Sequence, residues 1–233
     1  MAYDKVVDSA ILDANITTIA DAIRAKTGGT DALSFPTGMA EAIASITGGG
    51  SVFSYIYSGD YIESTNDDGK TVIRINTSGK LTVTTGKQSV NAFLQAGGGG
   101  GGCYYSGSSY RSAGGGGGGY DTTQVFLTEG SEYDITIGSG GAGDFKSTTT
   151  GGTAKGVAGG DTIAFNVTCT GGGGASVSSS SPSPGAAGTP NGQKGTYNGS
   201  KAGADGGAPN GGQGTASAAN NGGGDGYVEL TFV

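Results

Sequence analysis

The chain has 233 residues, of which 52 are glycine and 5 are proline, and its apolar fraction is 34%. A conventional hydrophobic core of full size is not expected, because globular domains carry roughly 45–50% apolar residues with glycine counted. The formal charge is −7, with 19 acidic and 12 basic residues spread along the chain, which argues against a nucleic-acid-binding protein with a basic face.

Residues 1–50 are predicted to be helical. Apolar residues recur at spacings of four, three and four along a helix from about Lys5 to Lys26, namely Leu12, Ile16, Ile19 and Ile23. A second short helix is expected after Phe35 and Pro36. Two helices this short cannot bury their apolar stripes alone. We therefore interpret residues 1–50 as an attachment or oligomerisation region. The apolar stripe is compatible both with a plain helical hairpin and with a trimer.

Residues 51–96 change to the period of β-strands and are predicted to form a small antiparallel β unit that links the two flanking regions. The expected strands cover 52–57, 71–75, 80–84 and 90–94, with turns between them at 66–69, 78–79 and 85–86. No stretch approaches 18 consecutive apolar residues, and the first ten residues lack an apolar signal-peptide core, so neither a transmembrane helix nor a signal peptide is expected.

Residues 97–233 hold most of the glycines, including the six-residue runs Gly97–Gly102 and Gly114–Gly119. Later glycines lie three apart, which is the period of an extended left-handed helix with three residues per turn. We therefore predict a bundle of polyglycine-II-like helices with a closing β-sheet. The alternative is a disordered glycine-rich spacer. The bundle is favoured because apolar strand-like segments persist in this region: 124–127, 133–137, 162–167 and 227–233.

The residues that catalysis or metal binding would need are scarce, so we expect no enzyme, no cofactor and no metal site. Histidine is absent, which removes the commonest general base and the commonest zinc ligand. A glycosidase needs only two carboxylates, but nothing positive supports one here. Cys103 and Cys169 are the only cysteines. A bridge between them is conceivable, and two reduced, buried thiols are the favoured interpretation.

Candidate contact residues lie in the inserts between the glycine segments. They are Tyr104, Tyr105, Tyr110 and Arg111 in the first insert, and Tyr197 and Asn198 in a later one. Tyrosine and serine together give rigid amphipathic area with adaptable hydrogen bonds, a mixture that antibody loops use. The alternative is that Tyr104, Tyr105 and Tyr120 only cover the edges of the bundle as packing residues.

Several segments together resemble the glycine-rich domains of bacteriophage tail proteins. The resemblance lies in the order of the segments 80–84, 90–102, 133–143 and 222–230, while the stretch 19–46 resembles an N-terminal motif of phage tail structural proteins. It implies a tail-fibre or tail-tip adhesin, similar in architecture to those of T-even-like phages. Such a protein binds a host cell-surface receptor, protein or polysaccharide, and contacts other tail proteins through residues 1–50.

The sequence thus predicts a mixed fold. Short N-terminal α-helices (1–50) and a β linker unit (51–96) precede a glycine-rich, polyglycine-II-like receptor-binding domain (97–233). The expected function is non-enzymatic attachment to the bacterial surface, without nucleic-acid binding or membrane insertion. The expected location is the virion tail, assembled in the host bacterial cytoplasm. A purely structural tail component is the alternative, and a surface-polysaccharide depolymerase is a weaker one.

Overall fold

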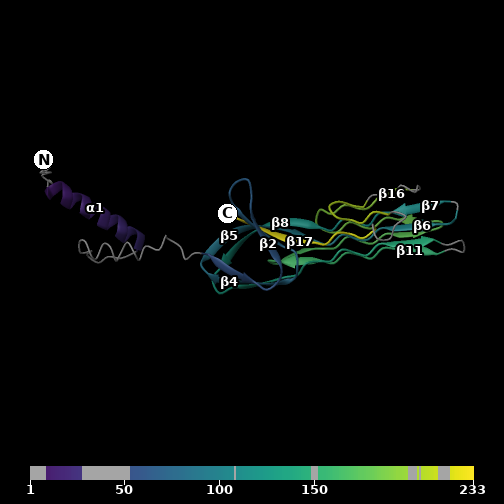
Figure 1. The fold of residues 1–233 in the computed structure, drawn as a ribbon, viewed down its shortest axis with the longest axis horizontal. Helices are drawn as coiled ribbons and strands as arrows, with labels where there is room; N and C mark the ends of the chain where they lie inside the picture. Colours follow the sequence, from purple (N-terminus) through teal and green to yellow (C-terminus); the bar gives the residue numbers. More distant parts are fainter. Residues whose placement is uncertain are drawn as a thin grey trace, which may run out of the picture. The chain divides into compact units, whose positions relative to one another are not determined.

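The computed structural model describes residues 9–27, 53–107, 109–147, 152–198, 204, 206–214 and 221–233. The chain divides into two compact units, Met1–Phe53 and Ser54–Val233 (Figure 1). No helix within these described ranges is long and apolar enough to cross a membrane.

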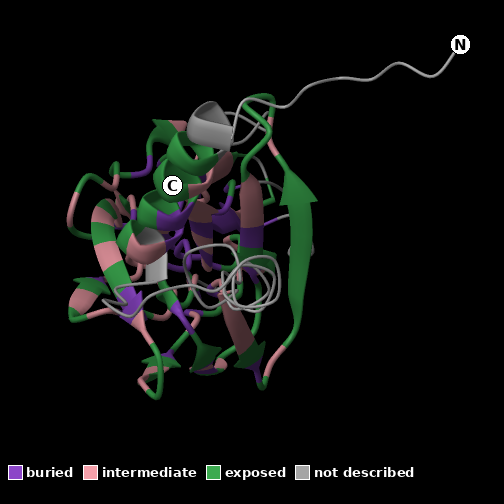
Figure 2. Cartoon of the chain, turned by 90° about the vertical axis from the view of Figure 1, so that its left-hand side faces the viewer, coloured by how far each residue is buried: buried purple, intermediate pink, exposed green. Residues whose placement is uncertain are grey.

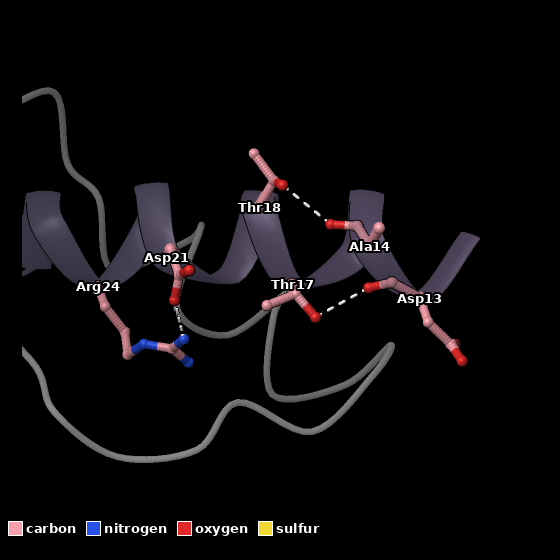
Figure 3. Close-up of polar contacts among 6 residues, drawn as sticks. All are labelled: Asp13, Ala14, Thr17, Thr18, Asp21 and Arg24. Atoms are coloured by element: carbon pink, nitrogen blue, oxygen red, sulfur yellow. Dashed lines mark hydrogen bonds and ion pairs between the residues drawn. The ribbon is translucent and has the colours of Figure 1, made fainter. Parts of the chain in front are cut away.

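The first unit contains helix α1, Ser9–Thr27. Thr17 and Thr18 each donate a side-chain hydrogen bond to the carbonyl one turn earlier, at Asp13 (2.8 Å) and Ala14 (2.9 Å) (Figure 3). Asp21 and Arg24, three residues apart on the exposed surface, form an ion pair. The bonds that Thr17 and Thr18 make to the preceding turn satisfy their hydroxyl groups inside the helix.

The predicted helix is confirmed where the structure describes it, but the buried face differs from the predicted stripe. Ile23 and Ala20 are buried and Ile16 is half-buried, whereas Ile19 is exposed. A small alanine thus takes the place that the spacing rule assigned to an isoleucine. The predicted second helix lies outside the described residues.

The second unit begins with two sheets that bury alternate side chains. The three-stranded sheet has the order β1-β4-β9 (Ser54–Tyr57, Gly79–Thr85, Glu132–Ile135) and the five-stranded sheet the order β2-β3-β17-β5-β8 (Tyr61–Thr65, Thr71–Ile75, Tyr227–Phe232, Lys87–Gln95, Tyr120–Thr128). All their strand pairs are antiparallel. Strand β4 contacts β8 across the interior, and buried residues lie on the inside of the strands (Figure 2). The core of these sheets includes Ile73, Leu81, Val83, Leu94, Leu127, Ile135 and Leu230.

Three further sheets complete the unit. They are β10-β6-β7-β16 (Asp144–Ser147, Gly102–Tyr105, Tyr110–Ala113, Tyr197–Asn198), β11-β14-β15 (Thr153–Lys155, Ser176–Ser178, Pro182–Ser183) and the hairpin β12-β13 (Thr162–Ala164, Val167–Cys169). Strand β10 pairs with β6 in parallel. Strands β6, β7, β11 and β16 lie at the end of the unit away from β2, β4 and β5 (Figure 1).

The predicted fold class is wrong for the glycine-rich region. The described residues form one N-terminal helix and five β-sheets, and no bundle of polyglycine-II-like helices is seen among them. The triplet spacing of glycines does not lead to a helical bundle here, because short glycine-poor segments between the runs pair into sheets instead. The predicted closing strand is confirmed as β17, which lies between β3 and β5 in the five-stranded sheet. Residues 51–96 and 97–233 thus contribute strands to the same two sheets.

The glycine runs themselves are extended segments that bond to other segments on several sides. The amide of Gly97 donates to Gly160 O (3.0 Å), that of Gly98 to Gly224 O (2.9 Å) and that of Gly99 to Gly116 O (2.8 Å). Three successive amides therefore reach three different parts of the chain. Backbone lies so close to backbone here that a side chain would have no room, which is the physical reason for the glycine content.

Alkaline pH is expected to destabilise the end of the unit that holds β1. The Tyr57 hydroxyl donates to Thr77 O at 2.6 Å, and burial raises the pKa of Tyr57 to about 12. Burial, with the nearby Glu63 carboxylate as the second cause, also raises the pKa of Tyr55. The folded state holds these protons more tightly than the unfolded chain does. The two hydroxyl groups therefore contribute their full share to the free energy of unfolding below pH about 10. This contribution is lost as the pH rises above that value, through about 12 for Tyr57.

Denaturant unfolding at a series of pH values above 9 would measure this effect. The variant Tyr57→Phe should lose part of the pH dependence, since Tyr55, Tyr227 and the two buried cysteines retain their shares. An unchanged slope in Tyr57→Phe would contradict the assignment.

Candidate functional site

The structure gathers all six sequence-predicted contact residues in one four-stranded sheet, β10-β6-β7-β16, called here the tyrosine sheet. In β6 and β7, Tyr104 lies opposite Arg111 and Tyr105 opposite Tyr110. Strand β16 adds the later insert, because Tyr197 pairs with Ala113 and Asn198 with Ser112. Two inserts that lie far apart in the sequence, as the Ser112–Asn198 separation of 86 shows, therefore join one sheet. By strand alternation, Tyr105, Tyr110 and Asn198 lie on one face of it, and Tyr104, Arg111 and Tyr197 on the other.

The exposed edge of the β6–β7 hairpin carries an aromatic pair. The rings of Tyr105 and Tyr110 stack with their centroids 4.4 Å apart, at the lower limit of the roughly 4.5–7 Å found for favourable aromatic pairs. The Tyr105 hydroxyl donates to Gly107 O at 2.9 Å, and Ser106 N donates to Ser109 O at 3.2 Å. The hairpin loop is therefore held by its own hydrogen bonds, which limits the conformational entropy that binding would cost.

Tyr104 is not a surface residue, which corrects its place among the candidate contacts. It is 2% exposed and belongs to a buried cluster with Ala113, Ala175 and Val177. The alternation of a strand puts Tyr104 and Tyr105 on opposite faces of the sheet, so only one of them faces solvent. Tyr104 thus matches the packing alternative.

The remaining candidates are partly or fully accessible. Tyr197 is 49% exposed, while Arg111 and Asn198 are half-buried. The Ser112 hydroxyl donates to Asn198 O at 3.0 Å, which fixes the register of the short strand β16. The accessible part of the tyrosine sheet therefore carries Tyr105, Tyr110 and the Asn198 amide on one face, and the Arg111 guanidinium and Tyr197 on the other.

Sequence reasoning missed strand β10, which extends the tyrosine sheet. It places Lys146 opposite Tyr104 and Ser147 opposite Tyr105, and both Lys146 and Ser147 are exposed. The backbone of Lys155 donates to the Asp144 carboxylate at 2.9 Å, which holds the start of β10. The available signal was the glycine-free stretch 144–147 between two glycine segments.

The two cysteines have structural roles in this unit. Cys103 and Cys169 are buried and free, which confirms the interpretation of two reduced thiols. Burial raises the pKa of Cys103, and burial followed by the charge of Asp121 raises that of Cys169 to about 11. Such thiols are poor nucleophiles. Within the described ranges, no three Cys, Asp or Glu residues are grouped closely enough to hold a metal ion.

Comparison with known proteins concerns the second unit. The glycine-rich domain family matches residues 71–232, from the start of β3 to the end of β17. The match says nothing of a phage tail, and no curated protein is significantly similar to the chain. Since the match covers more than half of the sequence, the chain belongs to the glycine-rich domain family.

Proposed function

We propose that this protein is a phage tail-fibre or tail-tip receptor-binding protein whose contact surface is the accessible part of the tyrosine sheet. The observation that carries the proposal is the convergence of the two tyrosine-bearing inserts on this sheet. Tyrosines that are at least partly accessible, on a firmly held backbone, offer contact area at low entropic cost. The order of the phage-like motifs along the chain supports the same assignment.

In this proposal binding specificity comes from side chains on short strands and loops, supported by hydrogen-bonded glycine segments. Function of this kind is expected on variable connections carried by a rigid scaffold. Residues 1–50 attach the chain to other tail proteins or to further copies of itself, and no catalytic step is involved. The carboxylates near the sheets instead make structural contacts: Glu129 accepts from Gly86 N at 3.0 Å, and Glu132 pairs with Lys80 at 2.8 Å.

Adsorption competition with the full chain tests the proposal. Host cells preincubated with the protein should adsorb fewer particles of the phage that encodes it. The double variant Tyr110→Ala, Tyr197→Ala should need about tenfold more protein for the same block, because interface tyrosines commonly contribute more than 1 kcal/mol. Tyr61→Ala is the matched control: Tyr61 is 41% exposed and lies on β2, in a different sheet.

The outcomes separate the candidate functions. If the double variant blocks phage adsorption as well as Tyr61→Ala and the unmodified protein do, the receptor contact lies elsewhere on the chain. No inhibition by the unmodified protein would leave a purely structural tail component, a role consistent with the dense backbone bonding of the glycine segments. Release of reducing ends from host polysaccharide would instead indicate a depolymerase.

A further inference from the structure

A groove of about 480 Å³ opens between strands β8 and β9, well away in the fold from the tyrosine sheet. Its volume falls within the roughly 300–1,000 Å³ of ligand sites. Its lining comes from β8, β9 and the β12–β13 hairpin, and includes Val125, Phe126, Tyr133, Ile163 and Phe165. Strand β8 is the last strand of the five-stranded sheet and β9 the last of the three-stranded sheet. The groove therefore lies between two free sheet edges.

The β8 edge presents unpaired backbone groups to the groove. Gly119 O accepts from Ala96 N, whereas Tyr120 N donates away from β5 to Pro190 O, so the even-numbered residues of β8 point their backbone groups away from β5. Within the part of the chain that the structure describes, the N–H and C=O of Gln124 and Phe126 on that side have no protein partner. Both residues line the groove.

The β9 edge also presents unpaired backbone groups to the groove. Ser131 O accepts from Val83 N on the β4 side, and Thr136 exchanges two hydrogen bonds with Ile163 on the other side (2.8 and 2.9 Å). The even-numbered residues of β9 therefore face away from β4, and the backbone groups of Glu132 and Asp134 point into the groove. No described residue bonds them there. Stacked sheets lie about 10 Å apart, roughly two strand spacings, so an added strand can reach both edges where the gap between them has that width.

One end of the groove lies at the turn that joins β8 to β9, where Ser131 N donates to Thr128 O at 3.1 Å, and the other end lies at the turn of the β12–β13 hairpin. Phe165 and Asn166 have φ values of 52° and 63°, the left-handed conformation that a two-residue hairpin turn needs at both positions. The conformation is uncommon for an aromatic residue, and it brings the Phe165 ring to 5.5 Å from that of Tyr133. The hairpin already pairs with the β9 side at Thr136, so a strand in the groove would continue the line of β12.

We propose that the β8–β9 groove is a docking slot for an extended segment of a partner protein, which adds as a strand between the two sheets. Inward side chains of that segment are apolar, because Val125, Tyr133 and Phe165 line the interior. Outward side chains are basic, because the Glu132 and Asp134 side chains are 55% and 86% exposed. Among the described residues, Lys80 is the one cation paired with them. Strand addition of this kind takes its affinity from main-chain bonds and its specificity from alternate side chains.

The probe is a short capped peptide that alternates lysine and valine, titrated into the isotope-labelled full chain. We expect shifts and slower hydrogen exchange at the amides of Gln124, Phe126, Glu132 and Asp134. The double variant Glu132→Gln, Asp134→Asn should bind the peptide about fivefold more weakly, the effect expected from two exposed ion pairs. Its charge-matched control is Asp67→Asn, Asp68→Asn, in the turn between β2 and β3, which should bind normally.

A second peptide distinguishes strand pairing from simple apolar contact. The same sequence with alternate backbone amides N-methylated cannot donate to one of the two edges, and we expect its binding to be lost. Retained binding would overturn the proposal, as would the absence of any shift at about 1 mM peptide. Protection of the same amides by self-association at high protein concentration would assign the groove to a second copy and also overturn it. None of these measurements involves host cells, so the proposed receptor binding succeeds or fails separately.

Discussion

Replacement of Gly99 by alanine is expected to lower the free energy of unfolding by about 3 kcal/mol or more. An added Cβ would lie well under 3.0 Å from the carbonyl oxygen of Gly173. That atom belongs to the backbone, so no rotamer change relieves the overlap. Moving the segment would break the bonds that Gly99 N makes to Gly116 O and that Gly212 N makes to Gly99 O, each 2.8 Å. Denaturant unfolding followed by circular dichroism measures the loss.

Gly222→Ala is the matched control in the same region. The nearest atom to an added Cβ there is Gly141 O at 3.8 Å, and Gly222 is exposed. Its effect should stay within about 0.5 kcal/mol. Equal midpoints for the two variants would show that the glycine segments are not packed as described.

Tyr104→Ala is expected to cost about 3–5 kcal/mol, the range for removing a large buried aromatic side chain. Its ring is almost fully enclosed beside Ala113, Ala175 and Val177. These neighbours are small. Ala113 and Val177 lie on strands, and the backbone of Ala175 is bonded to Gly100 and Gly156, so they cannot collapse far into the space. Thermal or denaturant unfolding of the full chain measures the change.

Tyr197→Ala should stay within about 0.5 kcal/mol, since Tyr197 is half-exposed on the edge strand β16. The pair of variants separates a packing tyrosine from a contact tyrosine in one sheet. A small loss in Tyr104→Ala would contradict its assignment to the core, and a large loss in Tyr197→Ala would make that residue structural as well.

The strands with clear apolar patterns could be predicted from sequence. The segments 71–75, 80–84, 90–94 and 227–233 correspond to β3, β4, β5 and β17. Strand β2 was missed because Tyr61–Thr65 is exposed along its whole length and lacks apolar alternation. The segment 162–167 was read as one strand, but it contains the turn at Phe165 and Asn166. Asn166 is a common turn residue, but Phe165 before it is not, so the turn signal there was weak.

The candidate contact residues were found by composition, but their arrangement was not. Strand pairing in the tyrosine sheet joins Tyr110–Ala113 to Tyr197–Asn198, and glycine-rich sequence between them carries no register signal. Whether a tyrosine is buried depends on which face its strand presents, which separates Tyr104 from Tyr105. The groove between β8 and β9 could not be predicted from the sequence, because it lies between the edge strands of two sheets that do not pair with each other.

The sequence by itself determined the need for close backbone packing, since runs of glycine offer no side chains to bury, and it determined the strands whose apolar residues alternate. Only the tertiary structure decided that the glycine-rich region forms sheets joined by cross-bonded extended segments rather than a helical bundle. The physical reason is that glycine is permissive in its backbone angles. Its conformation is therefore selected by hydrogen bonds to distant segments, such as Gly98 to Gly224, and not by neighbours along the chain.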